Sequence, residues 1–134
     1  MTESKGLEWL VVECAKCGVQ VARGLRAWTA ADGFSTDDGE PAVVKGFIAR
    51  AGTLLDAGYD MSKLNRDSYV VERSDLVNTQ ELDGCGCCDP DGAKILCPDG
   101  HQIGVFDGDC WKPHLVELDA SAVRVTGQKQ QAGF

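Results

Sequence analysis

The stretch LEWLVVECAKCG, residues 7–18, joins a run of strand-forming side chains directly to a Cys-x-x-Cys-Gly motif. After the motif, apolar side chains recur at Val19, Val21, Leu25 and Trp28. Two strand-like runs separated by a short segment containing glycine predict a β-hairpin. We therefore expect residues 7–28 to form a hairpin whose turn is residues 14–18.

All seven cysteines and both histidines of the chain lie in two groups. The first group is the pair Cys14 and Cys17. The second group is Cys85, Cys87, Cys88, Cys97, His101, Cys110 and His114. Tetrahedral Zn²⁺ is bound by thiolate and imidazole, and two ligands from one tight turn can both reach the metal at its bond length. The pattern predicts a zinc protein with one or two Zn²⁺ ions per chain.

Cys14, Cys17 and Gly18 after a Val/Leu strand resemble the metal-binding turn of zinc-ribbon and zinc-knuckle proteins. Cys85-Gly86-Cys87-Cys88 resembles a second such turn, and the resemblance covers only these short stretches. The 67 residues between Cys17 and Cys85 depart from the spacing of about 12–20 residues in simple zinc fingers. The resemblance therefore implies that residues 41–72 are inserted between two zinc-binding turns.

Two ligand assignments satisfy these spacings. The first has an all-cysteine site, Cys14, Cys17, Cys85 and Cys88, and a mixed site, Cys97, His101, Cys110 and His114. The second has one site, in which Cys97 and Cys110 join one of Cys85, Cys87 and Cys88, and the N-terminal pair is free or contributes. We favour the first because it uses more ligands. Pro98 and Pro113 exclude a regular helix across either Cys-x₃-His spacing but permit turns.

The remaining pattern predicts one main helix and several short strands. Pro41 is a helix-start signal, and apolar side chains follow at helical spacing up to Gly58: Val44, Phe47, Ile48, Ala51, Leu54 and Leu55. Strands are predicted over residues 67–72, 94–97, 102–106 and 115–118. We expect an α+β fold, with a small antiparallel sheet, this helix and a zinc-stabilised, turn-rich C-terminal subregion. The domain would span residues 1–126, and residues 127–134 would be a disordered tail.

Acidic residues concentrate in the part of the chain that holds most of the cysteines. The formal net charge is −8, and residues 75–119 contain ten acids and two bases. Such a surface repels phosphate backbones and attracts basic partners. We expect a basic protein partner and no nucleic acid.

No secretory h-region follows the N-terminus, and no apolar run approaches the ~18 residues of a membrane span, so we expect a cytoplasmic protein outside the membrane. Thiolate-rich zinc sites are usually closed and structural, which favours a binding protein without enzymatic activity, such as an immunity or inhibitory protein. Two alternatives remain open. One is a zinc-ribbon module in transcription or RNA metabolism, and the other is a zinc hydrolase or thiol enzyme.

Overall fold

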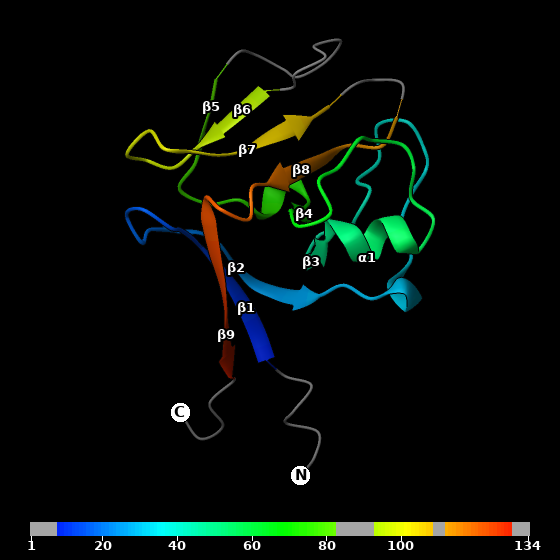
Figure 1. The fold of residues 1–134 in the computed structure, drawn as a ribbon, viewed down its shortest axis with the longest axis horizontal. Helices are drawn as coiled ribbons and strands as arrows, with labels where there is room; N and C mark the ends of the chain where they lie inside the picture. The colour runs from blue at the N-terminus through cyan, green and yellow to red at the C-terminus, as the bar shows by residue number, and fades with distance from the viewer. Residues whose placement is uncertain (1–7, 83–92, 109–111, 130–134) are drawn as a thin grey trace.

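Nine strands pair into one mixed sheet in the computed structural model, which describes residues 8–82, 93–108 and 112–129 (Figure 1). The strands are β1 (Glu8–Cys14), β2 (Gln20–Ala27), β3 (Phe47–Arg50), β4 (Tyr69–Val71), β5 (Gln80–Leu82), β6 (Ala93–Leu96), β7 (Gln102–Asp107), β8 (Leu115–Leu118) and β9 (Val123–Lys129). Their order is β5-β6-β7-β8-β4-β3-β2-β1-β9. The β2–β3 pair is parallel, and the other neighbours in this order are antiparallel.

The predicted N-terminal hairpin is confirmed. β1 and β2 pair antiparallel, and the turn between them is closed by two backbone hydrogen bonds. Cys14 N donates to Val19 O at 2.9 Å, and Gly18 N donates to Cys14 O at 2.8 Å. Gly18 has φ +77°, a left-handed conformation that favours glycine. The Cys-x-x-Cys-Gly motif is therefore the turn of this hairpin.

The predicted α+β class is wrong, because the regular secondary structure of the described chain is mostly strand and its only α-helix, α1 (Ala51–Asp56), has six residues. Residues 47–50, which were expected to be helical, form the strand β3 instead. Ile48 and Ala49 are adjacent and both buried, as in a strand covered on both faces, and such a run cannot be told from a buried helix by its sequence alone. Gly46 before it has φ +96°, and Val44 is 51% exposed rather than part of a buried stripe. No helix among the described residues is long and apolar enough to cross a membrane.

The strands predicted in the last third of the chain are present as β6, β7 and β8, but they form the continuous sheet rather than a separate subregion. The described structure continues past the predicted domain boundary at residue 126. β9 runs on to Lys129 and pairs with β1 along its whole length, from Cys14↔Val123 to Glu8↔Lys129. Residues 130–134 lie outside the described part of the chain.

The sheet bends so that its two ends enclose one apolar core. Val12 and Leu25, from β1 and β2, share a buried cluster with Ile95 and Ile103, from β6 and β7, although four strands separate β2 from β6 in the sheet. A second cluster lies beneath α1 and includes Leu54, Tyr59 and Val70. The bend therefore brings β1 and β2, near one end of the sheet, to face β6 and β7, near the other end.

Candidate metal centre

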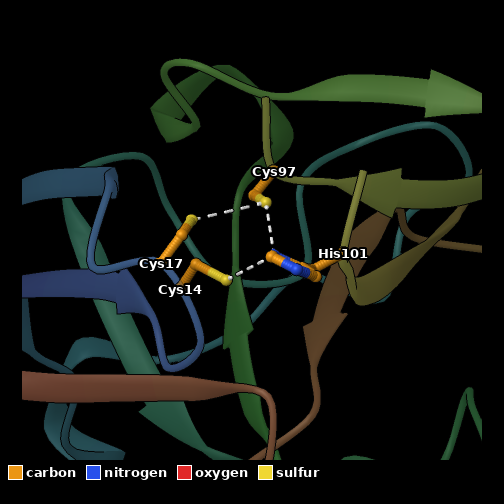
Figure 2. A group of neighbouring side chains, drawn as sticks. All are labelled: Cys14, Cys17, Cys97 and His101. Carbon is orange, nitrogen blue, oxygen red and sulfur yellow. Dashed lines mark hydrogen bonds between the residues drawn. The ribbon is translucent and has the colours of Figure 1, made fainter. Parts of the chain in front are cut away.

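Two hairpin turns place four potential metal ligands side by side. Cys14 and Cys17 occupy the β1–β2 turn, and Cys97 and His101 flank the β6–β7 turn. The second turn is closed like the first, because Cys97 N donates to His101 O and Gly100 N donates to Cys97 O, both at 2.9 Å. Both turns project to the same side of the molecule (Figure 1), and the four side chains point toward a common centre (Figure 2).

Three of the six distances between the four ligand atoms match those of a tetrahedral metal site. With metal–sulfur bonds of ~2.3 Å and metal–nitrogen bonds of ~2.0 Å, a tetrahedron has S···S edges of about 3.8 Å and S···N edges of about 3.5 Å. Cys17 Sγ lies 3.7 Å from Cys97 Sγ. His101 Nδ1 lies 3.6 Å from Cys14 Sγ and 3.3 Å from Cys97 Sγ. All four ligand atoms lie within 4.8 Å of one another, so this cluster could hold a metal ion.

Residues 76–80 hold the two turns in position through contacts that do not involve the thiols. Val77 N donates to Val21 O at 2.8 Å, and the Asn78 side chain donates to Gln20 O, so this segment is fixed to β2. The Gln80 side chain then donates to Cys97 O at 3.2 Å. These hydrogen bonds connect the end of one turn to the start of the other.

The inner half of the cluster is part of the core. Cys14 and Cys97 are fully buried and belong to the same apolar cluster as the facing strands, whereas His101 is half-buried and Cys17 is exposed. A metal ion here would therefore lie at the rim of the core, with one of its thiolate ligands at the surface.

Backbone amides favour the ionised form of the two buried thiols. Burial opposes ionisation of Cys14, but the amides of Cys17 and Lys16 and the neighbouring thiols outweigh it and lower the pKa of Cys14. Burial of Cys97 is likewise outweighed by the amides of His101 and Asp99, so the pKa of Cys97 is also lowered. N–H donors directed at thiolates are a common feature around metal-bound cysteine.

Cys17 differs from the other two thiols. The Val19 amide favours its ionised form, but burial, the thiols of Cys14 and Cys97 and the Asp99 carboxylate together raise the pKa of Cys17 to about 11. Burial is the largest of the effects that raise this pKa, and repulsion from the nearby thiols and carboxylate adds to it. A divalent cation at the centre would remove this repulsion by neutralising two of the charges.

The structure groups the predicted ligands differently from the favoured assignment. Cys97 and His101 join Cys14 and Cys17, whereas that assignment placed them with Cys110 and His114. His114 lies apart from this group, with its ring edge-on to Phe106 at a centroid distance of 5.6 Å. Its Nε2 is buried without a hydrogen-bond partner in the described part of the chain. The other predicted ligands, Cys85, Cys88 and Cys110, lie outside the described residues, as does Cys87.

The four clustered residues define a candidate Cys₃His metal site at the meeting point of two β-hairpin turns. Comparison of the chain with protein-family models, with curated proteins and with solved structures gave no match in any of the three.

Proposed function

We propose that the protein is a cytoplasmic zinc-binding protein without enzymatic activity, which binds a basic protein partner in the manner of an immunity or inhibitory protein. The observation that carries the zinc assignment is the close grouping of Cys14, Cys17, Cys97 and His101, in which three distances match a tetrahedral site (Figure 2). In this proposal the ion fastens the β1–β2 turn to the β6–β7 turn and stabilises the fold.

The donor set supports zinc and a structural role. Thiolates with one imidazole in a tetrahedral arrangement suit Zn²⁺, whereas Mg²⁺ and Ca²⁺ prefer oxygen ligands. Four protein ligands complete the coordination of zinc and leave no position for water or substrate, as in structural sites. The Cys-x-x-Cys pair lies between two strands and not at a strand-to-helix junction, which disfavours thiol–disulfide catalysis.

The partner assignment rests on charge. Three thiolates and one neutral imidazole around Zn²⁺ carry −1, so metal binding makes the protein one unit more negative than its formal −8. Within residues 75–119, three described acids are neutralised in ion pairs: Asp75 with Lys45, Glu81 with Arg73 and Asp107 with Lys112. Three other described acids of that segment form no ion pair with a described base: Asp99, Glu117 and Asp119. These carboxylates remain available to a basic surface.

One observation favours the alternative of a zinc-ribbon module that acts in transcription or RNA metabolism. Two hairpin turns each supply two potential ligands, as in zinc-ribbon proteins. The resemblance placed the second turn at Cys85-Gly86-Cys87-Cys88, however, and not at Cys97 and His101. The acidic charge opposes this alternative, because phosphate backbones are repelled. Tight, salt-dependent binding in a gel-shift assay at low salt would favour it over the basic-protein partner.

Elemental analysis of the purified protein tests the metal assignment. We expect at least one zinc per chain, and we expect Cys97→Ser to hold one zinc fewer than the wild type because a ligand of the ion is removed. X-ray absorption at the zinc edge should show sulfur and nitrogen neighbours in the wild-type protein. Absence of zinc from the wild type, or equal zinc in Cys97→Ser, would contradict the proposal.

The partner assignment needs its own measurement. Immobilised zinc-loaded protein is exposed to purified basic proteins and, in parallel, to acidic proteins of similar size. We expect complexes with basic proteins that weaken as salt is raised, because exposed charges are screened over about 10 Å at 0.1 M salt. If no purified basic protein forms a salt-sensitive complex, the assignment loses its support.

A further inference from the structure

A polar cavity of about 490 Å³ lies where the 65–68 loop meets β7 and β8. Its lining includes Asn65, Ser68, Gln102, Val105, Glu117 and Asp119. None of these residues is part of the Cys₃His cluster. The volume is within the range of about 300–1,000 Å³ that is typical of ligand sites, and the lining combines carboxylates, a hydroxyl and an apolar wall.

Two carboxylates in this cavity are held in place by hydrogen bonds, and no base among the described residues forms an ion pair with them. Glu117 Oε2 accepts the backbone N–H of Asn65 at 2.9 Å. Asp119 Oδ1 accepts the backbone N–H of Ser121 at 2.9 Å and its hydroxyl at 2.8 Å. These bonds lower the pKa of Asp119, so its carboxylate is ionised at neutral pH. Neither acid forms an ion pair with a described base.

Ser68 supplies an independent sign that the cavity receives a ligand. The residue is only 4% exposed. Backbone bonds fix its position, because Ser68 N donates to Asn65 O and Ser68 O accepts the N–H of Ala51. Its side chain makes no hydrogen bond within the described part of the chain, although it lines the cavity. The hydroxyl is not among the buried polar atoms that lack a partner, so it stays accessible from the cavity and can bond to a group bound there.

We propose that this cavity receives the guanidinium group of an arginine side chain from a basic protein partner. The inference rests on the proposed function, and it names the part of the surface that recognises the partner. Guanidinium is a planar cation with five N–H donors, so it can bond to several acceptors at once. The acceptors here are the carboxylates of Glu117 and Asp119 and the hydroxyl of Ser68.

The remaining lining fits the rest of an arginine side chain. Val105 offers an apolar wall to the methylene groups, which pack on apolar surface while the charged group bonds to polar atoms. Lysine would place a single compact ammonium in the cavity, and it lacks the planar fork that can reach separate acceptors. The overall negative charge would also draw a basic protein toward this face and speed its association.

The test is an NMR titration in which Nα-acetyl-arginine N-methylamide is added to the zinc-loaded full chain. We expect shifts of the backbone amides of Ser68 and Gly104, and no binding of the matching citrulline derivative, which has nearly the same shape without the charge. The lysine derivative should bind more weakly. Equal binding of the citrulline or lysine derivative, or shifts confined to other parts of the protein, would overturn the assignment of guanidinium to this cavity.

Two charge-removing variants locate the site. Glu117→Gln and Asp119→Asn each keep an oxygen that can accept the observed backbone hydrogen bond, so both should fold and retain zinc. Each should weaken arginine binding about tenfold or more, because each replaces a charged hydrogen-bond acceptor by a neutral one. Asp38→Asn removes the same charge at an exposed residue that does not line the cavity, and it should bind as the wild type does. Unchanged binding by Glu117→Gln and Asp119→Asn would overturn the proposal.

The same variants separate this inference from the proposed function. If a basic protein binds the wild type and both variants equally, the cavity is not its docking point, although the proposed function stands. If the arginine derivative binds the cavity but no basic protein binds the wild type, the cavity assignment stands and the proposed function fails.

Discussion

Cys14→Ser is expected to lose the zinc ion and to lower the melting temperature by roughly 10 °C or more. The metal would join residues that are 80 positions apart along the chain, since Cys17 and Cys97 would both be its ligands. A cross-link closing a loop of that length stabilises the folded state by about 4–5 kcal/mol in the chain-entropy treatment of disulfides. One kcal/mol shifts the melting temperature of a domain of this size by about 2–8 °C. Differential scanning calorimetry of the zinc-loaded protein measures the effect.

Treatment with a chelator distinguishes the effect of losing the metal from the local effect of burying a serine hydroxyl at position 14. We expect a strong chelator to lower the melting temperature of the wild type by nearly as much as the substitution does. The chelator should leave Cys14→Ser almost unchanged, because that variant has no ion to lose at this site. A wild-type protein whose melting temperature does not respond to zinc removal would show that the Cys₃His cluster is not a stabilising metal site.

Leu118→Ala is expected to lower the free energy of unfolding by about 2–5 kcal/mol, the usual cost of truncating a buried leucine. Leu118 is fully buried in β8, where it is paired with Gly104 of β7 on one side and Tyr69 of β4 on the other. It belongs to the cluster that the facing ends of the sheet enclose. Removing its side chain would leave a cavity in the middle of the sheet. Chemical denaturation monitored by circular dichroism gives the value.

Val44→Ala is the matched control, because it also shortens an aliphatic side chain but at a residue that is 51% exposed. We expect a change within about 0.5 kcal/mol, as for most surface substitutions. If the two variants lost the same stability, the bent sheet with its enclosed core would be the wrong description of the fold.

Local patterns in the sequence predicted the parts of the fold that depend on local interactions. The hairpin around the Cys-x-x-Cys-Gly motif and the strand over residues 115–118 are present as expected. The helix predicted after Pro41 is wrong because Phe47–Arg50 enters the sheet between β2 and β4. There both faces of the strand are covered, so its apolar residues do not alternate, and tertiary packing overrides the helical spacing.

For the candidate site, the residue types were predictable but their grouping was not. Cys14 and Cys17 form one half of the cluster, as the motif predicted, but Cys97 and His101 supply the other half. A signal for this was present, because Cys97-Pro98-Asp99-Gly100-His101 lies between two predicted strands and contains a turn glycine. The pairing of the two turns depends on how the sheet bends, which no local pattern specifies. The cavity lining was not predicted, since Ser68 and Glu117 come from segments that only the fold brings together.

The placement of β1 between β2 and β9 bears on how the chain folds. β2 follows β1 closely in the sequence and can pair with it as soon as it is synthesised. β9 is the last described strand to be synthesised, more than 100 residues after β1. Until then one edge of β1 has unpaired backbone groups, and closing the long loop back to it carries an entropic cost. Sheets dominated by such distant pairings fold slowly, in milliseconds to seconds. The nascent chain would therefore expose an aggregation-prone edge of β1 until β9 is synthesised.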